Sequence, residues 1–401
     1  MIKVEQHIIQ KSDSRWSVID AACFRSKNLF NAVLYRLRQT FFTENKTLSY
    51  PQLANDMKQD PDYCALPRKV SQWVLKQVTG DWQSFWSAQK AYQSHPTKFL
   101  GRPKLPNYKD KVGGRNILTY TIQALSKKLL RQGIIAPSQL PIEVQTQVDP
   151  DTIQQVRIVP RKTHYIVEVV YKDEVSLAQL PPNRVAGIDV GLNNLAAVTS
   201  NQQGLSPFLI NGRPLKSINQ HYNKRRAWLR SQLQQGQYTS KQIQRLTDKR
   251  NRQVKHYLHS ASKYIIKQLV QHGIGTLIIG KNEGWKQSVN MGKRNTQQFV
   301  QLPHAQFIEM LTYKAEEEGI QVILTEESYT SKCSFLDQEA LQKQIAYAGK
   351  RVKRGLFRAK DGRTINADVN AAANIIRKVI PNAFADGIEA IVVSPVRVLP
   401  V

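Results

Sequence analysis

The sequence predicts a multi-domain protein of mixed α+β and α/β class, and three observations support this prediction. The chain has 401 residues and 41% hydrophobic content, which is enough for more than one hydrophobic core. Short alternating strands and long amphipathic helices fill residues 1–182. Residues 183–380 follow a different order, with three strands first and then helices that alternate with strands. We therefore expect two or three domains.

Two parts of the first 182 residues have the alternating pattern of β-strands. Residues 1–10 alternate in this way, and short alternating runs separated by turn residues return between residues 117 and 177. We expect these strands to form a small antiparallel sheet or barrel, built from residues 1–10 and 99–182.

Long helices are expected between the first strand and the later ones. Apolar residues recur at helical spacing from Trp16 to Phe42, and a second helical stretch begins near Leu66. We expect a helical domain over residues 11–98 that interrupts the sheet or barrel. Three aromatic residues of the second stretch have the spacing of core positions, and stacking on nucleic-acid bases is the alternative for them. They are Trp73, Trp82 and Trp86.

Residues 183–380 contain the strands VAGIDVG, LAAVTS and PFLING, followed by a polar helical pair over residues 215–272. The strand TLIIGK, a helix, the strand QVILTEE and the helix DVNAAANIIRKVI come next. This order of elements is that of the RNase H fold. A basic insertion over residues 330–365 precedes the last helix, and residues 381–401 form a C-terminal tail.

The charge balance favours a polyanionic partner. Lys and Arg number 58 against 30 Asp and Glu, which gives a net charge of +28. The chain has neither a run of eighteen apolar residues nor a basic start followed by an apolar segment. We therefore expect a soluble cytoplasmic protein that binds nucleic acid and no membrane.

Two carboxylates stand where a metal-dependent nuclease of this fold would need them. Asp189 ends an apolar strand, and Asp368 lies in the first turn of the last helix. Asp368 alone is explained by helix capping or by the helix dipole. The pair is more specific, because carboxylates on the first strand and the last helix can together hold divalent cations that activate water.

Three segments resemble the motifs of TnpB proteins, the transposon-encoded relatives of type V CRISPR effectors. They are GIDVGLNNLAAV, the YTSK stretch near Tyr329 and INADVNAAANI. The resemblance implies a wedge-like N-terminal β-barrel, a helical recognition domain over residues 11–98 and a RuvC-like nuclease domain over residues 183–380. It also implies a guide RNA from the transposon end, and cleavage of double-stranded DNA beside a short motif by an endodeoxyribonuclease that uses Mg²⁺ or Mn²⁺.

The first departure from the family concerns its middle catalytic glutamate. The family places this glutamate at the end of the strand TLIIGK, where this chain has Gly280. Glu326 and Glu327 end the neighbouring strand QVILTEE, about 4.8 Å away in a sheet, and only one of them should face the site. We slightly favour Glu326, with Glu327 as the alternative and Glu283 as a further substitute.

The second departure concerns zinc. Only Cys23, Cys64 and Cys333 occur, so the family's four-cysteine ribbon cannot be built and no zinc is expected. The basic insertion instead has Asp361-Gly362 between two short β-prone runs, which predicts a hairpin. Basic residues of this hairpin and of an earlier loop are expected to contact nucleic-acid phosphates. They are Lys350, Arg351, Lys353, Arg354 and Arg358, with Arg102 and Lys104.

Two other functions compete with guided cleavage. Loss of a metal ligand at Gly280 would leave a nuclease-inactive RNA-guided DNA-binding protein. A nuclease or resolvase of RNase H type without a guide explains the carboxylates but gives no use to the N-terminal region.

Overall fold

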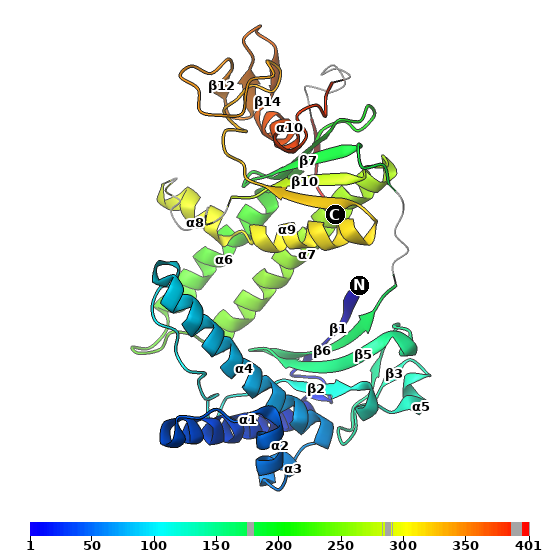
Figure 1. Cartoon of the computed structure of the whole chain (residues 1–401), viewed down its shortest axis with the longest axis vertical. Helices are drawn as coiled ribbons and strands as arrows, with labels where there is room; N and C mark the ends of the chain where they lie inside the picture. The colour runs from blue at the N-terminus through cyan, green and yellow to red at the C-terminus, as the bar shows by residue number, and fades with distance from the viewer. Residues whose placement is uncertain (175–179, 283, 285–289, 291, 386–394, 401) are drawn as a thin grey trace. The chain divides into compact units, whose positions relative to one another are not determined.

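The computed structural model describes residues 1–401 except 175–179, 283, 285–289, 291, 386–394 and 401, and except the side chains of 293–295. The chain folds into two compact units, Met1–Glu174 and Val175–Val401. We call them unit 1 and unit 2, and each is described by itself (Figure 1).

Unit 1 consists of long helices packed on an antiparallel sheet. The helices predicted near Trp16 and after Leu66 are confirmed, and the second begins directly after Pro67. The elements of unit 1 are β1 (Ile2–Gln10), α1 (Trp16–Glu44), α2 (Tyr50–Met57), α3 (Pro61–Cys64), α4 (Arg68–Ser94), β2 (Leu118–Thr121), α5 (Lys127–Leu130), β3 (Ile134–Ile135), β4 (Val144–Gln145), β5 (Ile153–Pro160) and β6 (His164–Lys172).

The sheet of unit 1 is open. Its strand order is β1-β6-β5-β2, and each neighbouring pair is antiparallel. β3 and β4 form a separate two-stranded sheet, so the described residues contain no closed barrel. Closure requires strands that pair continuously around the sheet. Within the region 117–177 that was predicted to form short strands, β3 and β4 have only two residues each.

One hydrophobic core joins the helices and the sheet of unit 1. It includes Leu37 of α1, Val74 of α4 and Val167 of β6. Trp82 is also in this core, with 3% of its surface exposed, which confirms the packing prediction for that residue. Trp73 and Trp86 remain 36% and 41% exposed.

Unit 2 has the predicted order of strands and helices. Its elements are β7 (Val185–Val190), β8 (Asn194–Ser200), β9 (Phe208–Asn211), α6 (Arg213–Ser231), α7 (Lys241–Gln271), β10 (Thr276–Gly280), α8 (Lys293–Gln301), α9 (His304–Glu317), β11 (Gln321–Thr325), β12 (Lys350–Lys353), β13 (Leu356–Arg358), β14 (Thr364–Asn366), α10 (Ala367–Val379) and β15 (Val396–Val398).

The main sheet of unit 2 has the order β11-β10-β7-β8-β9-β15. β7, β8 and β9 form an antiparallel meander, and β10 and β11 run parallel to β7. This is the arrangement expected of an RNase H-like sheet. β15 adds an edge strand parallel to β9 that the sequence did not predict.

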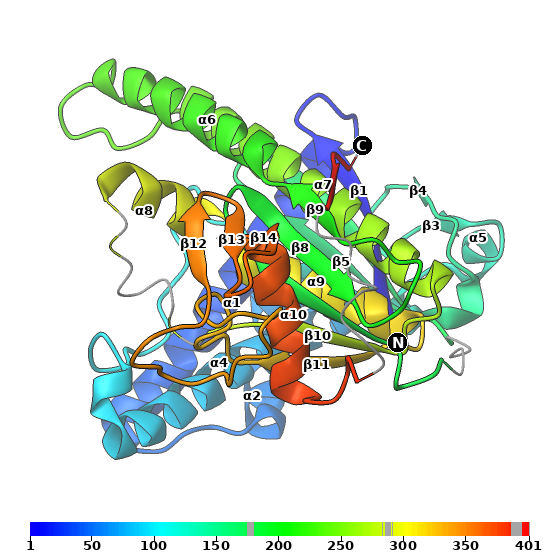
Figure 2. The same cartoon turned by 90° about the horizontal axis from the view of Figure 1, so that it is seen from above.

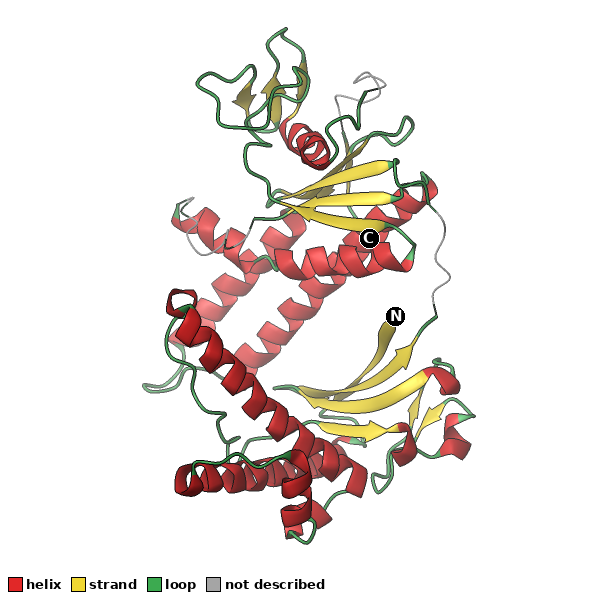
Figure 3. Ribbon diagram, in the orientation of Figure 1, coloured by secondary structure: helices red, strands yellow, loops and turns green. Residues whose placement is uncertain are grey.

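Helices cover both faces of this sheet (Figure 3). α7 and α9 pack on one face, around Ile188 and Leu277. α10 packs on the other face, where Ile376 meets Gly187 of β7. A Cβ on Gly187 would lie 2.5 Å from the carbonyl oxygen of Ala372, so glycine permits the close contact between α10 and β7.

The basic insertion forms a small sheet of its own, in the order β12-β13-β14. β13 and β14 pair around the predicted Asp361-Gly362 turn, where Gly362 has a φ of 89° that favours glycine. Cys333 is buried, and its thiol donates a hydrogen bond to the carbonyl oxygen of Ala340. The five basic residues named for this insertion are all exposed.

None of the helices in the described part of the chain is long and apolar enough to cross a membrane.

Candidate functional site

The parallel strands β7, β10 and β11 end side by side in unit 2. Ile188 pairs with Ile279, and Gly280 pairs with Thr325. Asp189 therefore lies at the same end of the sheet as Gly280. Neighbouring strands are about 4.8 Å apart, so side chains from these three ends can meet.

Glu327 fills the space above Gly280. A Cβ placed on Gly280 would lie 2.5 Å from Cγ of Glu327 and closer still to its Oε1. Cβ atoms in proteins essentially never approach other atoms within 3.0 Å. The Glu327 carboxylate thus stands where a side chain at position 280 would begin. The same Cβ would lie 2.7 Å from Cδ1 of Ile375.

Asn282 holds Glu327 through two hydrogen bonds. The amide nitrogen of Glu327 donates to Oδ1 of Asn282 at 2.9 Å, and Nδ2 of Asn282 donates to Oε2 of Glu327 at 3.3 Å. The other oxygen, Oε1, is buried and has no hydrogen-bond partner among the described residues. Burial raises the pKa of Glu327 to about 7. Asn282 therefore holds one carboxylate oxygen, and the other accepts no hydrogen bond from the described residues.

Glu326 has different surroundings. β11 ends at Thr325, so both glutamates follow the strand rather than ending it as predicted. Nζ of Lys378 lies 3.2 Å from Oε2 of Glu326, and the Ser328 hydroxyl donates to the same oxygen at 2.7 Å. The hydrogen bonds from Ser328 and Lys378 lower the pKa of Glu326, which is exposed. The structure thus places Glu327, and not the favoured Glu326, beside Gly280.

The substitute Glu283 lies outside the described residues.

Asp368 is brought to the site by the start of α10. Asn366 caps this helix, because its side chain accepts hydrogen bonds from the backbone of Asp368 and Val369. Capping therefore does not occupy the Asp368 carboxylate. Its Oδ2 accepts a hydrogen bond of 2.7 Å from Asn194, and its Oδ1 lies 3.6 Å from Nη2 of Arg351.

Electrostatics couple the three carboxylates. Burial raises the pKa of Asp189 well above its usual range, and the negative charges of Glu327 and Asp368 raise it further. Arg351 opposes this shift and lowers the pKa. Negative charges that raise one another's pKa in this way are stabilised by a nearby cation.

The donor chemistry fits a divalent cation. Carboxylate oxygens are the ligands that Mg²⁺ prefers, and Oε1 of Glu327 is a buried acceptor without a donor among the described residues. Within the same part of the chain, no three His, Cys, Asp or Glu side chains are close enough together to hold a metal ion as they stand. Both oxygens of Asp368 are occupied, by Asn194 and Arg351.

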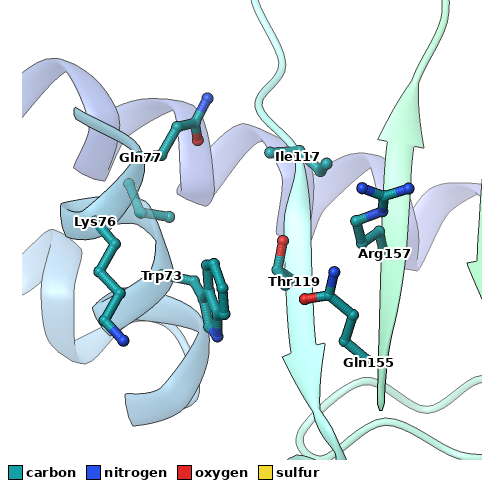
Figure 4. Close-up of a pocket in the computed structure, with 8 residues that line it drawn as sticks. Trp73, Lys76, Gln77, Ile117, Thr119, Gln155 and Arg157 are labelled. Atoms are coloured by element: carbon teal, nitrogen blue, oxygen red, sulfur yellow. The ribbon is translucent and has the colours of Figure 1, made fainter. Parts of the chain in front are cut away.

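A second candidate site is a cleft in unit 1 with a volume of about 340 Å³ (Figure 4). Side chains from α4 face those from β2, β5 and the residue before β2. The lining residues are Trp73, Val74, Lys76, Gln77, Ile117, Thr119, Gln155 and Arg157. Nζ of Lys76 lies 5.2 Å from the ring centre of Trp73, and Nη2 of Arg157 pairs with Glu168 at 2.7 Å. The cleft therefore combines an aromatic ring, two cations, two side-chain amides and one hydroxyl.

Two family models match segments of the chain that together contain the residues of the carboxylate site. Residues 168–286 match the OrfB_IS605 model, described as a probable transposase, and residues 304–375 match the Cas12f1-like TNB domain. The first range contains Asp189 and Gly280, and the second contains Glu327 and Asp368. These segments of the chain are therefore similar to the OrfB_IS605 and Cas12f1-like families.

Two curated proteins are also similar to this chain. The CRISPR-associated endodeoxyribonuclease Cas12f1 of Sulfoacidibacillus thermotolerans is 26% identical over 246 residues, which cover 57% of this chain and 54% of the relative. The TnpB-like protein ORF457 of Acidianus two-tailed virus is 25% identical over 232 residues, which cover 55% of this chain and 47% of the relative. The chain thus matches about half the length of these relatives.

Among solved structures, a cryo-EM structure of a Cas12f1–sgRNA–target DNA complex aligns with a TM-score of 0.39 and 16% identity. The alignment covers 94% of this chain and 98% of that one. The mini-RNA-guided endonuclease CRISPR-Cas_phi3 aligns with a TM-score of 0.45 and 10% identity, over 98% of this chain and 93% of that one.

Sequence reasoning missed Asn194, Asn282 and the cleft of unit 1. Asn282 stands two residues after Gly280, where a side chain leaving the strand end can turn back toward the neighbouring strand. The position of Asn282 just after the end of the strand is the sequence signal that could have identified it.

Proposed function

We propose that this protein is an RNA-guided, metal-dependent DNA endonuclease encoded by a transposon, which cuts DNA beside a short motif by two-metal-ion hydrolysis of a phosphodiester. The observation that carries the proposal is the Glu327 carboxylate above Gly280, at the strand end where Asp189 lies and where Asp368 is brought by α10. The match of residues 168–286 to the OrfB_IS605 model and the net charge of +28 support it.

Three carboxylates would hold the divalent cations, Mg²⁺ or Mn²⁺, and these are Asp189, Glu327 and Asp368. A bound cation of this kind supplies an activated water and neutralises charge on the phosphate. Asn282 orients Glu327, and Asn194 orients Asp368. Such supporting hydrogen bonds fix the direction in which a ligand oxygen points.

Arg351 has a role beside the carboxylates. Its guanidinium lies 3.6 Å from Asp368 and is half exposed, so it can move from the carboxylate to a phosphate of the nucleic acid. We propose that the neighbouring basic residues of the insertion contact phosphates further along the strand. They are Lys350, Lys353, Arg354 and Arg358, and Arg102 and Lys104 of the exposed loop in unit 1 are proposed for the same role.

The roles of the remaining parts follow the sequence prediction. We propose that residues 11–98 act in recognition and that the sheet of unit 1 acts as the wedge-like part, with residues 183–380 as the RuvC-like nuclease. Guide RNA and target double-stranded DNA are the proposed partners.

The cleft of unit 1 is proposed as the place where the duplex beside the target is contacted. Glutamine and threonine side chains can read base edges, and Lys76 and Arg157 can reach phosphates. Gln77→Ala and Gln155→Ala should then change the preferred flanking sequence in a randomised plasmid library. An unchanged preference with both variants would contradict this role.

The function is tested with the full chain and RNA expressed from its own locus. The copurified complex is incubated with Mg²⁺ and a plasmid library that carries the matched target. We expect double-strand cleavage that requires RNA, target match and metal, and that is lost in Asp189→Ala. Cleavage that does not depend on the RNA, or that survives Asp189→Ala, would overturn the proposal.

We favour cleavage over guided DNA binding without cleavage. The Glu327 carboxylate lies beside Gly280, which has no side chain of its own. Bound RNA and bound target without any cut, in the same experiment, would favour guided binding instead.

A further inference from the structure

The helix pair α6 and α7, with the connection between them, has a high density of positive charge. Residues 213–271 contain fourteen Lys and Arg residues and a single acidic residue, Asp248. This segment has a net charge of +13, nearly half of the +28 of the whole chain. A helical surface that serves solubility alone mixes both signs.

The basic side chains of α6 point away from the hydrophobic core. Leu215 and Leu229 of α6 are buried, and α6 runs along α7 (Figure 2). Within the described part of the chain, no ion pair neutralises four exposed side chains of α6, which are Lys224, Arg225, Arg226 and Arg230. Like charges one helical turn apart, as in Arg226 and Arg230, destabilise a helix. These basic side chains do not stabilise the helix, and their density is better explained by an anionic binding partner.

An exposed tryptophan lies within this basic surface. Trp228 is 50% exposed, and the guanidinium of Arg225 lies 4.0 Å from its ring centre. A second aromatic side chain, Tyr238 in the connection to α7, is 81% exposed. Arginine stacked on an indole, with further exposed ring surface, is a combination that binds unpaired bases.

We infer that α6 and its connection to α7 bind single-stranded or looped segments of RNA, with phosphates on the four basic side chains and an unpaired base on Trp228. This inference rests on the proposed function only for the identity of the RNA as the guide. RNA fits better than duplex DNA, because bases stacked inside a duplex cannot reach an indole, whereas loops and bulges of RNA present them.

The test measures the affinity of the full chain for the RNA that copurifies from its own locus, as a function of KCl concentration. The first variant carries Lys224→Gln, Arg225→Gln, Arg226→Gln and Arg230→Gln together. Each phosphate contact to a single strand contributes about 0.7 to the slope of log affinity against log salt. We therefore expect the slope to fall by roughly 3, and the affinity to fall at least roughly tenfold at low salt.

Trp228→Ala should act differently. We expect a roughly tenfold loss of affinity with an unchanged salt slope, because stacking releases no counterions, and Trp228→Phe should retain most of the affinity. The matched control removes four exposed basic side chains elsewhere, and its changes are Lys127→Gln, Lys128→Gln, Arg131→Gln and Lys162→Gln. It should leave affinity and slope close to those of the wild type.

Three results would overturn the inference. They are wild-type affinity in the α6 variants, an equal loss in the control, and equal competition by single-stranded DNA of the same sequence. Cleavage at saturating RNA is measured on the same preparations. A wild-type complex that binds RNA through α6 but does not cut would contradict the proposed function and leave this inference intact.

Discussion

The ends of the neighbouring strands β10 and β11 differ in a way that defines the candidate site. β10 ends at Gly280, which has no side chain, and the chain after β11 supplies Glu327, whose carboxylate fills the space above that glycine. Asn282 joins the two ends through its hydrogen bonds to Glu327. We propose that Glu327 takes the place of the glutamate that the resemblance to TnpB proteins leads one to expect at position 280.

We expect the largest loss of guided cleavage from Glu327→Ala, because Glu327 supplies the carboxylate that Gly280 lacks. Loss of a proposed cation ligand should slow guided cleavage at least roughly 1000-fold in Mg²⁺. Glu326→Ala is the matched control, since Glu326 pairs with Lys378 on the exposed side, and it should cleave within a few-fold of the wild type. Gel-based cleavage of a matched plasmid measures both. Equal losses in the two variants would remove the distinction between these neighbours.

Gly280→Ala should be the next most damaging change. The added Cβ collides with Glu327 and displaces its carboxylate, and a displacement of about 1 Å can cost roughly 100-fold in rate. Gly101→Ala is the control, because nothing lies within 4 Å of that position. Cleavage by Gly280→Ala at the wild-type rate would show that the reaction does not depend on the space that Gly280 leaves for the Glu327 carboxylate.

Asn282→Ala should have a smaller effect. Glu327 keeps its place but loses both hydrogen bonds from Asn282, and loss of a residue that orients a metal ligand costs roughly 10- to 100-fold in metal affinity or activity. The Mg²⁺ concentration that gives half-maximal cleavage should rise. Asn55→Ala, an exposed site on α2, serves as control. An unchanged metal requirement would assign Asn282 a structural role alone.

Metal binding can be followed without cleavage. Mn²⁺ should raise the melting temperature of the wild type and of Glu326→Ala by a few degrees, because a ligand that binds only the folded state stabilises it by roughly 1–3 kcal/mol at accessible concentrations. The increase should be smaller in Glu327→Ala. Differential scanning fluorimetry measures this shift, and an equal shift in all three proteins would place the cation elsewhere.

Much of unit 2 could be predicted from sequence because its signals are local. The strands of the β7–β8–β9 meander are short apolar runs with turns between them, and Asp189 and Asp368 stand at the ends of such runs. No local sequence signal distinguishes Glu326 from Glu327. Alternation of side chains applies only within a strand, and β11 stops at Thr325, before both glutamates.

Other features depended on contacts between distant segments. β15 pairs with β9, and nothing in its three residues, Val396–Val398, signals that partner. The expected barrel required pairing around a full circle, whereas the sheet of unit 1 leaves β1 and β2 as open edges. The hydrogen bonds of Asn282 exist only because β10 and β11 are neighbours in the sheet.

The most direct test of the exchange between Gly280 and Glu327 is the cleavage rate of the double variant Gly280→Glu with Glu327→Ala, compared with each single variant. Gly280→Glu alone should be impaired, because its side chain collides with Glu327. The double variant removes the collision with Glu327 and leaves only Cδ1 of Ile375, the end of a flexible side chain, among the three nearest atoms to the added Cβ. It also returns a carboxylate to the end of β10, so we predict cleavage at least roughly tenfold faster than that of Glu327→Ala. A folded double variant no faster than Glu327→Ala would contradict the exchange.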